Sequence, residues 1–418
     1  MTDKNKHIPQ GYKDSPLGII PKEWEVKRLG DFCISFSGGT PRSGTPSYYN
    51  GTIPFIRSGE INQDKTELFL SQEGLDNSSA KFVQKGDILY ALYGANSGQC
   101  SLSKINGVIN QAILCIRPNA HPYFLMSVLQ FNKNHYYNSY LQGGQGNLSG
   151  EIVSNYKIAL PSTEEQERIC SVLLLWDTAI EKQSELIEKL KLRKRALMQQ
   201  LLTGKKRLPG FRGEWKEVKL GDVSNFLRNN TLSREQLNDD DGVINNIHYG
   251  DVLIKYPSII DCRKEKLQYI NDGVSILTDY VENGDVIMSD TAEDETVGRV
   301  CEVQNVGNKK ILAGLHTMLI RPHDKLFAPY FLGYYLNSEA YHKQLIPLIQ
   351  GIKVCSIGKV AVQNTVLTIP SLEEQRIIAS VLVKADKEIE LAKEKLANLQ
   401  SQKRGLMQQL LTGKKRFV

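Results

Sequence analysis

The chain has 418 residues, of which 41% are hydrophobic, and a formal net charge of +6. This length leaves room for two or three domains, each with its own core. The first residues are polar and no run of about 18 apolar residues follows, so we predict a cytoplasmic protein and exclude secretion and membrane insertion. Seven scattered cysteines without a C-x-x-C pair are typical of reduced thiols, not of a disulfide framework or a zinc site.

Charge is unevenly distributed along the chain. Residues 215–370 contain 16 Lys and Arg against 20 Asp and Glu, whereas residues 371–418 contain 10 against 6. The mild overall excess of positive charge favours a polyanionic partner such as nucleic acid. In that case the acidic second block has to present its basic residues locally.

The first block, residues 24–160, is predicted to be rich in β-structure. Short alternating runs such as residues 53–57 and 87–93 are separated by Gly, Asn, Ser and Pro. A helix is predicted after Arg117-Pro118. The stretch Phe36–Gly39 superficially suggests a cofactor-binding glycine loop, but it lacks the strand-loop-helix context, and we predict a tight loop that approaches other backbone.

A long helix is predicted next. Pro161-Ser162 followed by two glutamates is a strong helix start, in which Ser162 caps the helix and Glu165 returns the bond. No Pro or Gly interrupts the sequence from there to Thr203, and Gly204 is placed to end the helix. A helix of about 39 residues would be roughly 58 Å long, which suits a spacer. Two long core helices of a bundle are the alternative.

The second block, residues 215–370, resembles the first in its alternating runs, and residues 371–418 repeat the helix at a constant offset of 209. The motif Glu-Trp followed by Leu-Gly-Asp recurs at an offset of 191, so the second block has 18 additional residues. A repeat in strict register indicates one structural unit used twice. By this repeat Trp24 corresponds to Trp215 and Val418 to Pro209, which predicts that residues near both ends of the chain lie close together.

Apolar residues in both helices are spaced alternately by three and four, as in a coiled-coil seam. The predicted helix-helix seam consists of Ile169, Leu173, Trp176, Ile180, Ile187, Leu190, Leu197 and Leu201 in the first copy, and Ile378, Leu382, Ile389, Leu396, Leu399, Leu406 and Leu410 in the second. Lys194 and Lys403 fall on the seam, where we expect them either to extend their ammonium groups to solvent or to set the register, and not to act in catalysis.

Several motifs together carry a resemblance to a known family. They are Asp14–Trp24 (DSPLGIIPKEW), Gly38–Pro41 (GGTP), Ile53–Arg57 (IPFIR), both PSxEEQ helix starts, both LMQQLLTG helix ends and Leu208–Trp215 (LPGFRGEW). In this respect the chain resembles the specificity subunit of type I restriction-modification systems over nearly its whole length.

The resemblance implies an α+β fold in which two mixed α/β target-recognition domains are joined by two long antiparallel helices that form a coiled coil, with pseudo-two-fold symmetry. The corresponding parts are residues 1–160 (first recognition domain with its leading segment), 161–207 (central helix), 208–370 (second recognition domain) and 371–418 (C-terminal helix).

The resemblance further implies a non-catalytic subunit in which each recognition domain reads one half of a bipartite, asymmetric sequence in double-stranded DNA, and the helices set the unread spacer. The implied partners are two methyltransferase subunits, which use S-adenosylmethionine to methylate adenine, and restriction/translocase subunits in the full complex. We expect this chain to bind no cofactor and no metal. The sequence itself contains no Asn/Asp-Pro-Pro-Tyr/Phe, no phosphate-binding loop and no metal-spaced His/Cys cluster, and its seven histidines form no evident constellation.

Base readout requires Arg or Lys for guanine, Asn or Gln for adenine, and small or hydroxyl side chains where backbone comes close. The candidates in the first block are Ser37, Thr40, Arg42, Arg57, Ser58, Tyr93 and the loop 142–147 with Gln145 and Asn147. In the second block they are Arg228, Asn229, His248, Tyr249, Lys255, the stretch Ser289 to Thr291 with Thr291 itself, and Lys353. Arg57 and Gln145 are the first two to test.

Two other functions remain open from the sequence. The chain would also suit a coiled-coil adaptor whose two β-rich domains bind proteins, because the repeat geometry alone allows it. It would equally suit the recognition subunit of a system that methylates without restricting.

Overall fold

The computed structural model describes residues 8–140, 147–273 and 278–417. The contacts divide the chain into two compact units, one of residues 1–183 with 395–418 and one of residues 184–394.

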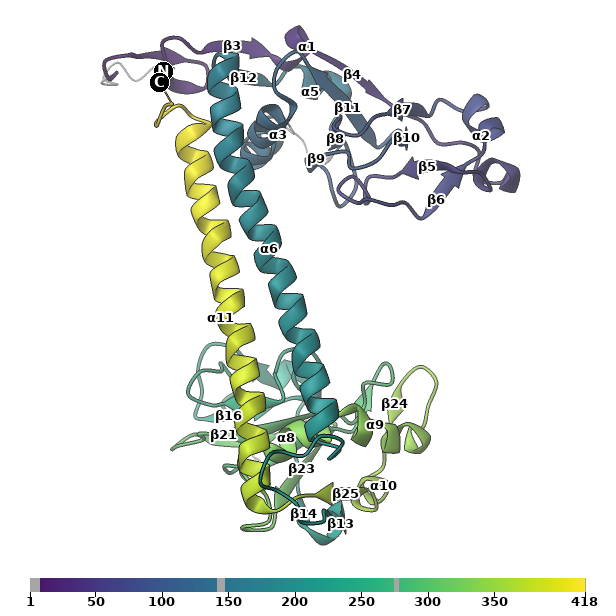
Figure 1. The fold of residues 1–418 in the computed structure, drawn as a ribbon, viewed down its shortest axis with the longest axis vertical. Helices are drawn as coiled ribbons and strands as arrows, with labels where there is room; N and C mark the ends of the chain where they lie inside the picture. The colour runs from purple at the N-terminus through teal and green to yellow at the C-terminus, as the bar shows by residue number, and fades with distance from the viewer. Residues whose placement is uncertain (1–7, 141–146, 274–277, 418) are drawn as a thin grey trace. The chain divides into compact units, whose positions relative to one another are not determined.

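Both units are mixed α/β structures, as predicted, and both contain part of each long helix, α6 (Thr163–Leu201) and α11 (Leu372–Leu410) (Figure 1). The first unit holds the beginning of α6 and the end of α11, and the second unit holds the remaining parts.

The first unit is built on two four-stranded sheets. One is antiparallel, in the order β4 (Cys33–Ser37), β11 (Ile113–Pro118), β8 (Ile88–Ala91) and β9 (Cys100–Leu102). The other has the order β6 (Leu68–Leu70), β5 (Ile53–Ile56), β10 (Gly107–Ile109) and β7 (Lys81–Val83), with β5 and β10 parallel. The helices α3 (Pro122–Phe131), α4 (Lys133–Tyr140) and α5 (Gly150–Ser154) lead from β11 towards α6.

The second unit repeats this plan with additions at the sheet edges. Its larger sheet has the order β14 (Ser224–Leu227), β23 (Thr317–Pro322), β19 (Val286–Ser289), β21 (Val300–Gln304) and β17 (Ile259–Asp261). Its smaller sheet has the order β15 (Leu237–Asn238), β18 (Gln268–Ile270), β16 (Ile244–Ile247) and β22 (Lys310–Ala313), with β16 and β22 parallel. After β23 come α8 (Phe331–Leu336), α9 (Glu339–Leu345) and α10 (Lys359–Gln363).

An equivalent ion pair in each unit shows that the two units share one frame. Arg117 of the first Arg-Pro motif pairs with Asp87 at 2.7 Å, and Arg321 of the second pairs with Asp285 at 2.8 Å. In each unit this pair ties the start of one central strand to the end of its neighbour. The sequences of the two blocks have diverged, but this brace has not, and neither has the order of the four strands that the antiparallel sheet of the first unit shares with the larger sheet of the second.

The helix starts confirm part of the predicted capping. The hydroxyl of Ser162 accepts from the backbone N–H of Glu165 at 3.3 Å, and Ser371 caps α11 in the same way through Glu374. The predicted return bond from the glutamate is wrong. Glu165 instead accepts from Trp24 and Arg416, and Glu374 accepts from Arg207, because a buried carboxylate is better compensated by a guanidinium than by one backbone N–H.

The helix ends were predicted correctly. Gly204 and Gly413 both have φ of +68°, the left-handed conformation that closes a helix. The backbone N–H groups of Lys206 and Lys415 donate to the carbonyls of Gln200 and Gln409 at 3.1 Å, which satisfies an otherwise free helical carbonyl in each copy.

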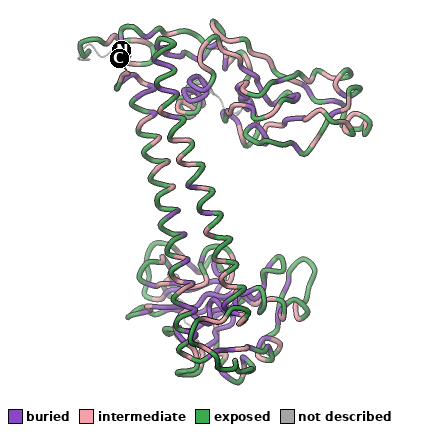
Figure 2. The backbone as a smooth tube through the Cα atoms, in the orientation of Figure 1, coloured by how far each residue is buried: buried purple, intermediate pink, exposed green. Residues whose placement is uncertain are grey.

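The residues of the predicted seam are all buried or half-buried, and most positions between them are exposed. Figure 2 shows this contrast along α6 and α11, whereas the strands of both units are buried over longer stretches. Each end of the helix pair belongs to a core. Ile169, Leu173 and Leu410 pack into the core of the first unit, and Leu201 and Leu382 into that of the second.

Residues near both ends of the chain meet in the first unit, as predicted. The hydroxyl of Tyr12 donates to the carbonyl of Gly413 at 2.9 Å, and Arg416 pairs with Glu23.

Candidate nucleic-acid interface

The candidate residues of the first unit lie in loops that follow its strands. Ser37 ends β4 and is exposed, as are Arg42 and Asn147. Thr40 hydrogen-bonds to Gln111, a residue of the loop before β11. Gln145 lies outside the described residues.

The loop at Gly38 and Gly39 is a close backbone approach, as predicted. A Cβ atom at Gly38 would lie 1.8 Å from the carbonyl oxygen of Ile109, and one at Gly39 would lie 2.1 Å from Oγ of Ser79. The N–H of Gly39 donates to the same carbonyl at 3.2 Å. Only glycine fits at these two positions, which carry Thr40 and Arg42 to the end of the sheet.

Arg57 is held by two acids of its own unit. Its guanidinium pairs with Glu60 at 3.1 Å and with Glu67, and the carboxylate of Glu60 is itself buried. The adjacent Ser58 offers its carbonyl to Asn96 at 3.4 Å. A guanine contact by Arg57 would therefore compete with two carboxylates, and it stays a prediction.

In the second unit four polar side chains form a cluster where the strands β19 and β23 meet their loops. The ring of His316 lies edge-on to Tyr249, with centroids 5.3 Å apart. Its Nδ1 is 3.3 Å from Oγ1 of Thr291 and 3.5 Å from Oδ1 of Asp290, and Thr291 donates to the same Asp290 oxygen at 2.8 Å. We call Tyr249, Asp290, Thr291 and His316 the second-unit cluster.

His248 supports this cluster from beneath. It is only 6% exposed, its ring lies 4.6 Å from that of Tyr249, and its Nδ1 accepts the N–H of Gly250 at 3.2 Å. Burial, followed by the charge of Arg234, lowers the pKa of His248 below its ordinary value. At neutral pH His248 is therefore an uncharged ring whose proton is on Nε2.

Asn229 is half-buried and holds a neighbouring backbone segment. Its amide donates to the carbonyl of Gly314 at 3.1 Å, and the N–H of Gly314 donates to Ile247 at 2.9 Å. These bonds hold the loop that presents His316, whose φ of +55° is left-handed and unusual for a residue other than glycine.

The remaining candidates of the second unit lie at its edges. Arg228 is exposed and 3.7 Å from Asp279, and Lys255 is exposed and donates to the carbonyl of Lys266 at 3.1 Å. Lys353 is exposed in the loop before β24 (Cys355–Ser356), a short strand that pairs with Thr291.

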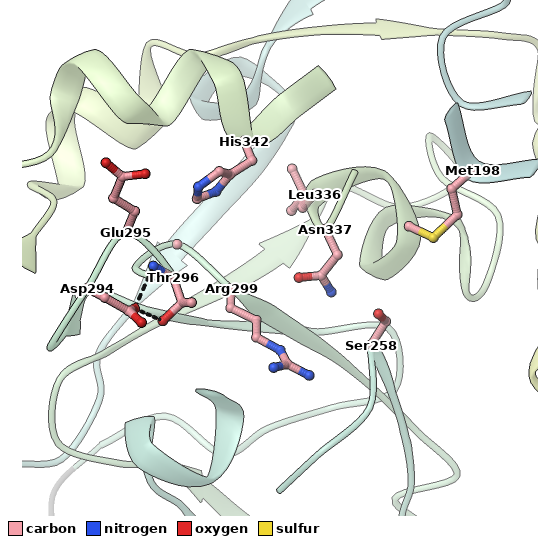
Figure 3. Close-up of a pocket in the computed structure, with 10 residues that line it drawn as sticks. Met198, Ser258, Asp294, Glu295, Thr296, Arg299, Leu336, Asn337 and His342 are labelled. Atoms are coloured by element: carbon pink, nitrogen blue, oxygen red, sulfur yellow. Dashed lines mark hydrogen bonds between the residues drawn. The ribbon is translucent and has the colours of Figure 1, made fainter. Parts of the chain in front are cut away.

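The second unit also has a cavity of about 760 Å³ next to the loop 294–299 (Figure 3). Four of its polar side chains, those of Asp294, Thr296, Arg299 and Asn337, bond to other groups of the same unit. Asp294 accepts from the N–H and the hydroxyl of Thr296, Arg299 donates to the carbonyls of Leu253 and Tyr256, and Asn337 bonds to the backbone of Val300. Within the described ranges no group of three His, Cys, Asp or Glu residues could hold a metal ion.

The sequence analysis missed part of the second-unit cluster. It included Asp290 within a candidate stretch without giving it a role, and it treated the histidines as unrelated. Two of them, His248 and His316, flank Tyr249 although they are 68 positions apart in the chain. The signal that would have found them is the internal repeat, once it is aligned strand by strand.

Comparison with known proteins assigns the chain to a family. The family described as type I restriction modification DNA specificity domain matches residues 21–192 and 212–401, and the chain belongs to this family. Its relatives are specificity subunits, which are non-catalytic.

One of these relatives, the type I restriction enzyme MjaVIII specificity subunit of Methanocaldococcus jannaschii, is 24% identical over 415 residues, covering 94% of this chain and 93% of the relative. The fold is similar to a chain from a structure titled "Structural basis underlying complex assembly and conformational transition of the type I R-M system", with a TM-score of 0.60, 19% identity, and coverage of 95% of this chain and 99% of that one. The crystal structure of the type I restriction-modification system S subunit from M. genitalium has a TM-score of 0.52 and 14% identity, and covers 93% and 96% of the two chains. None of the helices in the described part of the chain is long and apolar enough to cross a membrane.

Proposed function

We propose that this chain is a cytoplasmic subunit that recognises a bipartite, asymmetric sequence in double-stranded DNA, one half through each unit, and assembles methyltransferase and restriction subunits on it. The observation that supports this function best is the repetition of one frame with different loop residues. Both units keep the same order of four strands in one sheet and the same Arg-Asp brace, whereas the side chains at the ends of the central strands differ. A frame used twice with two surfaces is suited to reading two different sequences.

In this proposal α6 and α11 set the length of the unread spacer, because each helix contributes residues to both units without interruption. The parts that carry out the function are the recognition domains 1–160 and 208–370 and the helices 161–207 and 371–418. The chain itself binds no cofactor. S-adenosylmethionine is used by the methyltransferase subunits, of which we propose two per complex.

Duplex binding by the full-length chain tests the DNA-binding part. Contacts to phosphates release counterions, so the affinity should fall steeply as salt rises from 50 to 200 mM. A protein-binding adaptor would show weak duplex binding at every salt concentration. Mapping methylated adenines in a genome with and without this subunit then identifies the target, and replacing residues 24–160 with the block of another member should change only one half of it.

A further inference from the structure

The two units can be superposed in register at the ends of their central strands, because three backbone hydrogen bonds recur there. The N–H of Leu92 donates to Ala112 at 2.8 Å, and the N–H of Asp290 donates to His316 at 3.1 Å. The carbonyl of Leu92 accepts from Leu148, and that of Asp290 accepts from Ile357. The carbonyls of Ala91 and Ser289 accept from Gly98 and Gly298.

Asp290 therefore occupies the position of Leu92, and His316 that of Ala112. In the first unit both residues are apolar and buried. Since the same backbone frame forms around leucine and alanine, it does not require a carboxylate and an imidazole. The polar pair of the second unit must serve something other than the frame.

The carboxylate of Asp290 is placed to accept a further hydrogen bond. Its Oδ1 contacts Thr291 and His316, and for Oδ2 no partner occurs among the residues that the structure describes. The side chain is 27% exposed, and the ring of its neighbour His316 also packs edge-on against the ring of Tyr249. The left-handed backbone of His316 is held by the bonds to Gly314 and by Asp290 itself, so the acceptor is preorganised.

A carboxylate on a surface that binds DNA cannot contact phosphate, because like charges repel. Its favourable contact in the major groove is a base amino group, and the pairing that geometry favours for Asp is the N4 amino group of cytosine. We propose that Asp290 is a specificity-determining residue of the second unit that accepts a hydrogen bond from cytosine N4, and that His316 positions it. This proposal rests on the proposed function.

The test is selection of full-length protein on a random-sequence duplex library, followed by competition with duplexes changed one base pair at a time. Asp290→Asn keeps the shape but replaces one acceptor oxygen by a donor. It should reduce discrimination about 10- to 100-fold at one base pair where the wild type selects cytosine, and leave the other half of the target unchanged. His316→Gln should broaden the preference at that same base pair.

Asp294→Asn is the matched control. Asp294 is exposed on the neighbouring loop, so this substitution makes the same change in charge outside the second-unit cluster. Three results would overturn the inference. The first is an unchanged base preference in Asp290→Asn, and the second is an equal change in affinity for all sequences in Asp290→Asn and in the control Asp294→Asn. The third is a loss of base preference in Asp290→Asn at an A·T pair. A wild-type protein that selects no sequence would instead refute the proposed function, so the two failures are distinguishable. Thermal unfolding of each variant verifies that it is folded.

Discussion

The ammonium group of Lys403 on α11 contacts the carboxylate of Asp177 on α6, although both residues lie along a largely apolar seam. The second unit has the same pair with the two helices exchanged, where Lys194 of α6 lies 2.5 Å from Asp386 of α11. The two lysine side chains are only 15% and 19% exposed. A charge at a seam is normally costly, so a partner on the opposite helix fixes which residues face one another.

Replacing Lys403 by Met should destabilise the first unit by about 1 kcal/mol, because Asp177 loses its cation but stays partly solvated and keeps its bond from Tyr123. Urea unfolding of the full chain measures this change. Lys395→Met, an exposed lysine on the same part of α11, should have a much smaller effect. The double variant with Asp177→Leu should lose less stability than the sum of the two single changes, and additivity of the two single changes would contradict the pairing.

The buried glutamates at the helix starts predict an asymmetry between the units. Arg416→Met and Arg207→Met each leave a glutamate, 5% or 2% exposed, without its guanidinium, which typically costs about 3 kcal/mol or more. Glu165 still accepts the indole N–H of Trp24 at 3.0 Å, whereas the indole N–H of Trp215 has no acceptor among the described residues. Arg207→Met should therefore be the more destabilising change.

Hydrogen exchange resolved by peptide checks this asymmetry, since it reports each unit separately. The exposed neighbours supply controls, because Lys415→Met and Lys206→Met remove the same charge without uncovering a glutamate. Equal loss of protection in the two arginine variants would show that Trp24 contributes nothing to holding Glu165.

Glu302 predicts a pH dependence of the second unit. Burial raises its pKa to about 7, although the backbone N–H groups of Gly333 and Tyr330 donate to it. The folded unit therefore holds a proton between about pH 4.5 and 7 that the unfolded chain has released, and its free energy of unfolding should fall across this range as pH rises, by on the order of 3 kcal/mol.

Glu302→Gln removes the titrating group and should flatten this dependence, as measured by urea unfolding at pH 5, 6, 7 and 8. The exposed Glu282, nearby in the same unit, supplies the control variant Glu282→Gln, which should keep the slope of the wild type. A slope that persists in Glu302→Gln would assign the pH dependence to another group.

The spacer hypothesis predicts the effect of a longer helix. Four residues inserted into α6 after Gln183 add about 6 Å and slightly more than one turn, so the seam keeps approximately its face. The tolerated spacer should change by about one to two base pairs while both half-targets stay the same. Selection on duplexes with spacers of different length measures this. An altered half-target with an unaltered spacer is incompatible with helices that set the distance.

The repeated parts could be predicted from the sequence because their signals are local. Heptad spacing, Ser162 and Gly204 specify where a helix begins, which side it buries and where it ends, and the structure agrees to within two residues. The roles of Glu165 and Glu374 could not be predicted, because their partners come from segments more than 140 residues away. Local capping and distant pairing compete for the same carboxylate, and only the fold decides.

The candidate site was predicted less completely for the same reason. Tyr249, Thr291 and His248 were identified by residue type and do lie together. His316 was not, because a single histidine carries no signal until β23 places it beside β19. Arg57 shows the opposite error. Its residue type suggests a guanidinium that is free to contact DNA, but nearby residues of its own unit supply two carboxylates that bind it.

The contact between Tyr12 and Gly413 joins the two ends of the chain in the first unit, and this determines which unit becomes complete first. The second unit, residues 184–394, is one continuous stretch of chain, whereas the first unit needs residues 395–417 to complete its core and to supply Arg416. Synthesis therefore supplies every residue of the second unit before the last residues of the first unit, although the first unit begins the chain. A chain that ended after residue 394 would contain the whole second unit but would leave Glu165 without Arg416, so its defect would lie in the unit that is translated first.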